Sequence, residues 1–241
     1  MRIAFDLDGV LADLHTPFVR TALRLYPDLE AGVIEAGDPA GESDVHDTDV
    51  PPVLPGINLT RQQSDGVWRD LAARENFWES LDEIEPGAIA RLAELADARE
   101  WEVLFITSRP TSTGRTVQRQ SQRWLEARGF RLPSVYAVHG SRGRIAAALA
   151  LDAVIDDRAD NCLDIVLESK AGAVLVWRGP LNAVPPATRR LGIAVVPTVH
   201  EALDALVQAE EAVGGGTFLD RLRRLVGLRP RVASPLAREG S

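Results

Sequence analysis

The 241-residue chain has almost no cysteine and almost no lysine. Cys162 is its single cysteine, which excludes an internal disulfide, and no apolar run with a cleavage site follows Met1, so we expect a reduced, cytoplasmic setting. Lys170 is its single lysine, so roles that commonly fall to lysine must here fall to arginine. No stretch approaches the roughly 20 apolar residues that a membrane-spanning helix needs, and we expect no stable membrane insertion.

Acidic side chains outnumber basic ones. The formal net charge is −8, and the main body lacks the arginine clusters that bind nucleic-acid phosphates, so a nucleic-acid polymer is not an expected partner. Residues 28–49 hold eight acidic side chains and no Lys or Arg, which predicts a solvated loop, with an acidic binding surface as the alternative. Residues 211–241 predict a glycine linker and a basic amphipathic tail, which could contact a partner, the acidic body or, less favoured, a membrane surface.

Short apolar runs alternate with helical spacing along most of the chain. From about residue 86 onward, strand-like runs are separated by segments whose apolar residues recur every three or four positions. This alternation predicts an α/β fold, a Rossmann-like, doubly wound parallel sheet with helices on both faces. The expected strands are Ile3 to Phe5, Val103 to Ile106, Val135 to Val138, Ala153 to Ile155, Ala173 to Val176 and Ala194 to Val196.

The stretch after the first strand interrupts this rhythm. The next strand arrives only near Trp101, and a connection of that length predicts an inserted domain. Helical spacing around Phe18 and a capping box from Thr60 to Gln63 indicate that the insert is helical. We therefore expect a core of residues 1–13 and 86–210, a small helical cap of residues 14–85, and a linker and tail of residues 211–241.

Pairs of carboxylates follow two of the expected strands. Asp6 and Asp8 end the first strand, with Gly9 to let the backbone turn, and ligands of open α/β sheets collect at such strand ends. A plain turn would explain one aspartate and the glycine, but not both acids. Asp156 and Asp157 end a later strand, where a hard cation bound through oxygen would compensate the adjacent charges; capping of the next helix by Asp157 is the alternative.

Hydroxyls and arginines complete this set of strand-end residues. Thr107, Ser108 and Arg109 follow the second strand, where hydroxyl and backbone donors could hold a phosphate oxygen, although such residues often only cap a helix. Arg142 or Arg144, at the start of a later helix, could reach an anion at the same edge. Each of these two arginines could equally be solvated.

In this order, and each at a strand end, these sites resemble those of the haloacid dehalogenase (HAD) superfamily of phosphatases. Within that superfamily the chain looks like the 5′-nucleotidase, or deoxyribonucleotidase, branch over about residues 1–180. The strings that carry the resemblance are Asp6-Leu7-Asp8-Gly9-Val10-Leu11-Ala12-Asp13, Asn76-Phe77-Trp78-Glu79-Ser80-Leu81 with Pro86-Gly87-Ala88, Ile106-Thr107-Ser108-Arg109-Pro110, and Ile155-Asp156-Asp157-Arg158.

The resemblance implies a Mg²⁺-dependent phosphate-monoester hydrolase that works through an aspartyl-phosphate. Asp6 would attack phosphorus, and Asp8 would act as general acid and base. Thr107 and Ser108 would bind the phosphate, together with the residue at a position that is usually lysine. That position falls here on Arg144, or on Arg142 as the second choice. The implied Mg²⁺ ligands are the Asp6 carboxylate, the Asp8 main-chain carbonyl and the Asp156 carboxylate, with Asp157 in the outer shell.

The same resemblance implies a small phosphorylated partner, a nucleoside or deoxynucleoside 5′-monophosphate. Phe18 and Trp78 are candidates for stacking on a base and Arg109 for a further substrate contact, although the aromatic residues more often hold a small helical domain together. A sugar phosphate is the first alternative, because a fold does not specify the leaving group. A catalytically silent binding or scaffold module is the alternative from another class. The sequence leaves the oligomeric state open.

Overall fold

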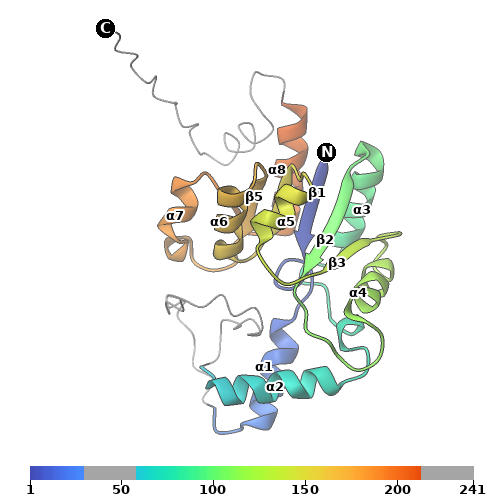
Figure 1. Ribbon diagram of the computed structural model, residues 1–241, viewed down its shortest axis with the longest axis vertical. Helices are drawn as coiled ribbons and strands as arrows, with labels where there is room; N and C mark the ends of the chain where they lie inside the picture. The colour runs from blue at the N-terminus through green and yellow to red at the C-terminus, as the bar shows by residue number, and fades with distance from the viewer. Residues whose placement is uncertain (30–57, 213–241) are drawn as a thin grey trace.

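The computed structural model describes residues 1–29 and 58–212, which form a helix-flanked parallel sheet and a smaller helical part beside one of its edges (Figure 1). The acidic stretch and the basic tail discussed above lie largely or wholly outside these residues. The sheet has six strands in the order β3-β2-β1-β4-β5-β6, and all its pairings are parallel. The strands are β1 (Arg2–Asp6), β2 (Glu102–Thr107), β3 (Ser134–Ala137), β4 (Ala153–Asp156), β5 (Gly172–Val176) and β6 (Ala194–Val196).

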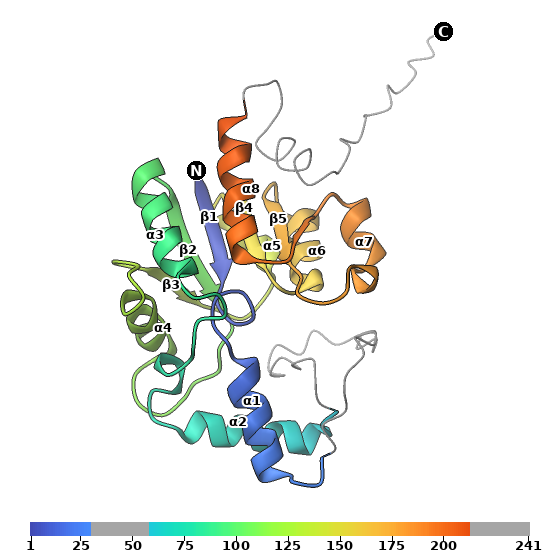
Figure 2. The same cartoon turned by 180° about the vertical axis from the view of Figure 1, so that it is seen from behind.

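Helices cover both faces of the sheet, which explains why its inner strands are apolar almost throughout (Figures 1 and 2). In β1, Ile3 and Phe5 pack into one buried cluster and Ala4 into the other. The predicted doubly wound α/β fold is therefore confirmed. The helices of this part are α3 (Ala88–Arg99), α4 (Val117–Glu126), α5 (Arg142–Ala148), α6 (Ala159–Glu168), α7 (Pro186–Arg190) and α8 (Val199–Glu211), with a short 3-10 turn η2 (Leu181–Ala183).

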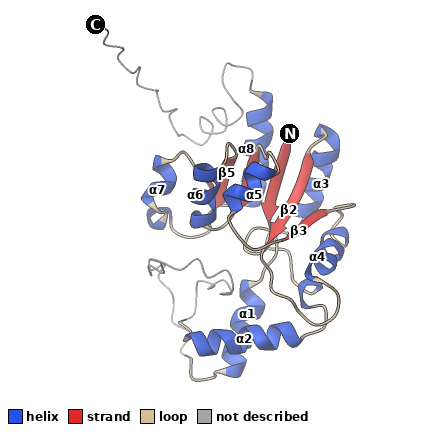
Figure 3. Ribbon diagram, viewed as in Figure 1, coloured by secondary structure: helices blue, strands red, loops and turns tan. Residues whose placement is uncertain are grey.

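The order of the strands gathers the expected site residues at one edge. The chain runs from β1 outward through β2 to β3, and then crosses back to β4 on the other side of β1 (Figure 2; the strands are the red arrows of Figure 3). Such a reversal opens a crevice at the carboxyl ends of the two central strands, because neighbouring connections leave in opposite directions. Asp6 ends β1 and Asp156 ends β4, so both lie at this switch point.

The remaining helices lie beyond the carboxyl edge of the sheet (Figure 1). They are α1 (His15–Leu25) and α2 (Arg61–Ala73), which pack against each other. The expected capping box is present, since the Thr60 side chain accepts from the Gln63 amide and the Gln63 side chain accepts from the Thr60 amide. The stretch then forms the 3-10 turn η1 (Phe77–Glu79), which packs on α4, so residues near the end of the expected cap contact the sheet part.

Two connecting segments, which run side by side, join the helical pair to the sheet. Asp13 donates to the carbonyl of Asp82, and Ile84 donates to the carbonyl of Leu11. The chain thus leaves and re-enters the sheet part through one narrow, hydrogen-bonded neck. Among the described residues, no helix combines the length and apolarity required to cross a bilayer.

Candidate active site

Gly9 brings the loop after β1 against the end of β4. Its φ of +82° lies in the left-handed region, and a Cβ at this position would stand 2.0 Å from the Asp157 Oδ2 atom. Any side chain here would strain the backbone and displace the Asp157 carboxylate, so glycine is the residue that suits this turn. The turn that follows Asp6 and Asp8 is thus part of how the carboxylates of β1 and β4 come together.

Three carboxyl groups at these strand ends, Asp6 and Asp156 buried and Asp157 half-buried, have little compensating charge around them. Burial, and next the nearby Asp156 carboxylate, raise the pKa of Asp6 well above its ordinary value despite the guanidinium of Arg142. Burial likewise raises the pKa of Asp156, and burial followed by the charge of Asp156 raises that of Asp157 to about 7. The ionised forms of these three carboxyl groups are thus disfavoured within the protein. A bound cation would favour the ionised forms again.

Asp156 is oriented by the helix that follows it. The Asn161 Nδ2 atom donates to both Asp156 carboxylate oxygens, at 3.0 Å and 2.9 Å, and the Arg158 amide donates to Oδ1 at 2.8 Å. Asn161 was not singled out from the sequence, where an asparagine in the first turn of a helix has no distinguishing pattern. The side chain of Asp156 is therefore held rigidly at the end of β4, with none of its surface exposed.

The oxygen donors of this edge suit a hard divalent cation such as Mg²⁺. The described part of the chain contains no group of three or more His, Cys, Asp or Glu side chains arranged to hold an ion. The expected ligand set does not require such a group, since it combines the Asp6 and Asp156 carboxylates with a main-chain carbonyl. The raised pKa values of these two acids agree with a site that needs an added positive charge.

Arg142, the second choice of the two arginines, is the one that lies among these acids. Its Nη2 atom donates to Asp6 Oδ1 and to Ser108 Oγ, both at 3.1 Å, and its Nε atom lies 4.0 Å from Asp156 Oδ2. The Nε and Nη1 atoms are buried and have no hydrogen-bond partner within the described residues. Two donor groups of Arg142 therefore remain for an anion.

Arg144, the first choice of the two arginines, lies at the surface. Its side chain is 82% exposed and lies 3.8 Å from Glu168 at the surface. The physical reason is the helical period, because residues two positions apart on a helix differ in direction by about 200°. With Arg142 facing the sheet edge, Arg144 necessarily faces solvent.

A tight contact between α5 and α6 directs Arg142 inward. The Ser141 hydroxyl and the Gly143 amide both donate to Asp164 Oδ2 at 2.8 Å. A Cβ at residue 143 would lie 2.2 Å from the Asp164 carbonyl oxygen, so a larger residue would force the helices apart. Sequence reasoning missed Gly143 and Asp164, because their role depends on how two helices cross.

Thr107 and Ser108 reach the same cluster from the end of β2. The Thr107 hydroxyl lies 3.4 Å from Asp8 Oδ2 and accepts from the Arg109 amide, also at 3.4 Å. Ser108 is exposed and accepts from Arg142 through its hydroxyl. Both hydroxyls expected at a phosphate site therefore lie beside the acids and the arginine.

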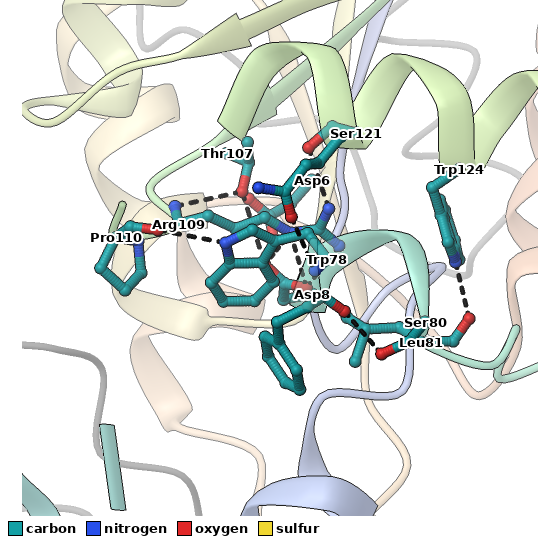
Figure 4. Close-up of polar contacts among 12 residues, drawn as sticks. Asp6, Asp8, Trp78, Ser80, Leu81, Thr107, Arg109, Pro110, Ser121 and Trp124 are labelled. Carbon is teal, nitrogen blue, oxygen red and sulfur yellow. Dashed lines mark hydrogen bonds and ion pairs between the residues drawn. The ribbon is translucent and has the colours of Figure 1, made fainter. Parts of the chain in front are cut away.

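The three candidates for direct substrate contact are engaged inside the protein. The Arg109 side chain is fully buried and forms an ion pair with Asp8 (Figure 4). Trp78 is buried against that guanidinium, and its indole Nε1 donates to the Pro110 carbonyl oxygen. Phe18 is buried against Trp68 at a ring distance of 5.2 Å. In this arrangement these side chains serve internal packing, the alternative considered for the aromatic residues.

A further arginine, Arg178, holds the loop that follows the β1 acids. It donates to the main-chain carbonyls of Gly9 and Val10 and pairs with Glu85 at 2.5 Å. Glu85 in turn accepts from the amides of Val199 and His200 at the start of α8. Burial would raise the pKa of Glu85, but hydrogen bonds from the Val199 amide and Arg178 outweigh it and lower the pKa. No motif marks these contacts, because their residues are far apart in sequence.

Comparison with known proteins places the fold but not the activity. No family model matches the chain, and no curated protein matches it. A putative β-phosphoglucomutase from Thermotoga maritima has a similar structure, with a TM-score of 0.50, 16% identity, and coverage of 86% of this chain and 98% of that one.

A HAD family hydrolase from Deinococcus radiodurans R1, solved with bound phosphate and sodium, aligns with a TM-score of 0.49 and 18% identity, over 86% of this chain and 94% of that one. At such identities the likeness concerns architecture alone. The chain thus shares with the Thermotoga maritima protein its α/β architecture, which here is a parallel sheet flanked by helices.

Proposed function

We propose that the chain is a Mg²⁺-dependent phosphate-monoester hydrolase that acts through an aspartyl-phosphate on Asp6. The observation that carries this proposal is the pairing of a buried, poorly compensated carboxylate on β1 with the spare buried donors of Arg142. A carboxylate that attacks a phosphate dianion must first have its charge and that of the phosphate offset. Arg142 contacts Asp6 and has two nitrogen atoms left for phosphate oxygens.

Each polar residue of the cluster has a part in this reaction. Asp6 attacks phosphorus, and Arg142, Thr107 and Ser108 hold the phosphate oxygens. Asp8 gives a proton to the departing oxygen and later takes one from the water that cleaves the aspartyl-phosphate.

The metal would be held by the same strand ends. The Asp6 and Asp156 carboxylates and the Asp8 main-chain carbonyl would bind Mg²⁺, and Asp157 would orient the outer shell. When bound, Mg²⁺ would supply the positive charge that the acids lack.

The proposed substrate is a nucleoside or deoxynucleoside 5′-monophosphate, and this part rests on the motifs between residues 1 and 180. Phe18 and Trp78 do not support it, because both are packed inside the protein. A sugar phosphate is an equally weighted alternative, and the likeness in fold to a putative β-phosphoglucomutase favours considering it. A silent binding module is disfavoured, because buried acids with raised pKa values reduce stability and have no purpose without chemistry.

Release of inorganic phosphate from a panel of nucleoside monophosphates and sugar phosphates, with and without Mg²⁺, tests the proposal. We expect turnover that depends on Mg²⁺ and that disappears in the Asp6→Asn variant. Turnover in EDTA, or full activity of the folded Asp6→Asn variant, would refute it. The ranking of substrates separates the nucleotide from the sugar-phosphate reading.

A further inference from the structure

Arg109 forms a two-pronged ion pair with Asp8. Its Nε atom donates to Asp8 Oδ1 and Oδ2 at 3.0 Å and 2.8 Å, and its Nη2 atom donates to Oδ1 at 2.7 Å. The guanidinium is completely buried, whereas the Asp8 side chain keeps 16% of its surface exposed. A planar fork of this kind fixes the carboxylate plane as well as its position. The exposed part of Asp8 is therefore directed by Arg109.

The guanidinium is itself held from three sides. Its Nη1 atom donates to the hydroxyl of Ser121 on α4 at 2.9 Å. Its central carbon lies 4.8 Å from the ring centroid of Trp78 and 5.8 Å from that of Trp124. Trp78 is pinned in turn, because its amide donates to Gln120 Oε1 at 3.0 Å. Packing and hydrogen bonds from α4 and η1 thus leave the guanidinium one orientation.

Arg109 and Arg142 differ in what they leave free. Each of the three side-chain nitrogens of Arg109 donates to a group of the protein, whereas Arg142 has two buried nitrogens without a partner among the described residues. An arginine with every nitrogen engaged is poorly suited to bind a substrate phosphate. This contrast assigns substrate binding to Arg142 and a different role to Arg109.

We infer that Arg109 is a positioning residue, which holds the Asp8 carboxylate in the orientation needed for proton transfer to and from the substrate. The inference rests on the proposed function, because it concerns the proton donor of that reaction. The stretch around Trp78 packs on α4. Through Trp78, the segment that returns from the insert becomes part of the support for Asp8.

The test replaces the fork by a point charge. In the Arg109→Lys variant we expect kcat to fall by about 100-fold, because a displaced acid loses most of its catalytic contribution. KM for the best substrate of the panel should stay within about twofold. In an Asp8→Asn background the same substitution should change kcat by less than about threefold, because Arg109 acts through Asp8.

Arg128 offers a matched control. Its guanidinium lies 4.3 Å from the centroid of the same Trp124 ring, and it donates to the carbonyls of Trp124 and Leu81, but no contact joins it to Asp8. Arg128→Lys should therefore leave kcat and KM unchanged. Circular dichroism and thermal unfolding of every variant monitor the fold.

Several outcomes would overturn the inference, and they are distinguishable from failure of the proposed function. A wild-type chain without Mg²⁺-dependent phosphate release would remove both. An active wild type whose Arg109→Lys variant keeps its kcat, raises KM instead, or loses as much activity in the Asp8→Asn background would remove the inference alone. If Arg109→Lys does not fold, Ser121→Ala removes only the Nη1 anchor. We then expect a fall in kcat of about threefold or more at constant KM, and an unchanged kcat would overturn the inference.

Discussion

The pKa of an acidic side chain in the helical pair is lowered, whereas the pKa values of the acids at the sheet edge are raised. On α2, Asp70 accepts from Arg24 of α1 at 2.5 Å and from Arg74 one turn later at 2.8 Å. The hydrogen bond from Arg24, more than any other interaction, lowers the pKa of Asp70. At the sheet edge, burial raises the pKa of both Asp6 and Asp156, and the charge of Asp156 raises that of Asp6 further, although Arg142 is close to both.

Under the proposed function, this difference distinguishes charged groups that stabilise the fold from charged groups that take part in the reaction. Asp70 is partly exposed and has two arginine partners, so it links α1 to α2 and needs no further partner. Buried acids without full compensation lower the stability of the folded chain, and a protein retains them where a ligand completes the site. Under the proposed function, the strand ends are the reactive part and the helical pair is a packed accessory.

The largest expected effect is that of Asp6→Asn. We expect phosphate release to fall by about 10⁴-fold or more, because the nucleophile is lost. The melting temperature in EDTA should stay the same or rise, because the substitution removes a carboxylate whose ionised form is disfavoured by burial. Calorimetry and a phosphate assay on one preparation check both. A marked loss of stability in EDTA would show that Asp6 is a structural residue.

The two arginines of α5 provide the next largest effect, with one as the control of the other. Arg142→Ala should lower kcat/KM by about 10² to 10³-fold, since it removes donors beside the attacked phosphate. Arg144→Ala should leave kcat/KM unchanged, because this side chain is exposed and its acidic neighbour is Glu168 at the surface. Steady-state kinetics on the best substrate of the panel measure kcat/KM for both variants. Equal losses in both variants would contradict the assignment of Arg142 to the site.

The sequence allowed the strands to be predicted but not the choice between these arginines. Apolar runs such as Val103 to Ile106 report burial on both faces, so strand positions and the parallel sheet follow from local pattern. Which arginine faces inward depends on the contact between Gly143 and Asp164, and that contact exists only after α5 and α6 pack. The Arg109–Asp8 pair could not be predicted either, because its members are 101 positions apart and meet only in the folded chain.

The dependence of the melting temperature on pH provides a further test of the comparison, with a smaller expected effect. The pKa of Asp157 is raised to about 7, so the folded chain binds a proton that the unfolded chain releases near pH 4. This contribution to stability is present below about pH 4 and is lost as the pH rises through 7. In EDTA the melting temperature should therefore fall between pH 5 and pH 8, by roughly 3 °C or more.

Mg²⁺ and one variant provide the controls for that pH dependence. A cation favours ionised carboxylates, so Mg²⁺ should stabilise the chain more at pH 8 than at pH 5. Asp157→Asn should flatten the fall in EDTA. An unchanged slope in this variant would mean that other groups titrate in the window.

The smallest effect belongs to the helical pair, and it should have the opposite sign. Arg24 and Arg74 lower the pKa of Asp70 in the folded chain, so its contribution to stability is present above its unfolded pKa near 4 and is lost as the pH falls through the lower, folded value. Because Asp70 is partly exposed, Asp70→Asn should lower the free energy of unfolding by less than about 1 kcal/mol at pH 7. Urea unfolding at pH 7 and pH 3 measures this difference, which should shrink at the lower pH, while phosphate release stays at the wild-type rate. A large loss of activity in Asp70→Asn would mean that the helical pair takes part in the chemistry, and the contrast between the two regions would then fail.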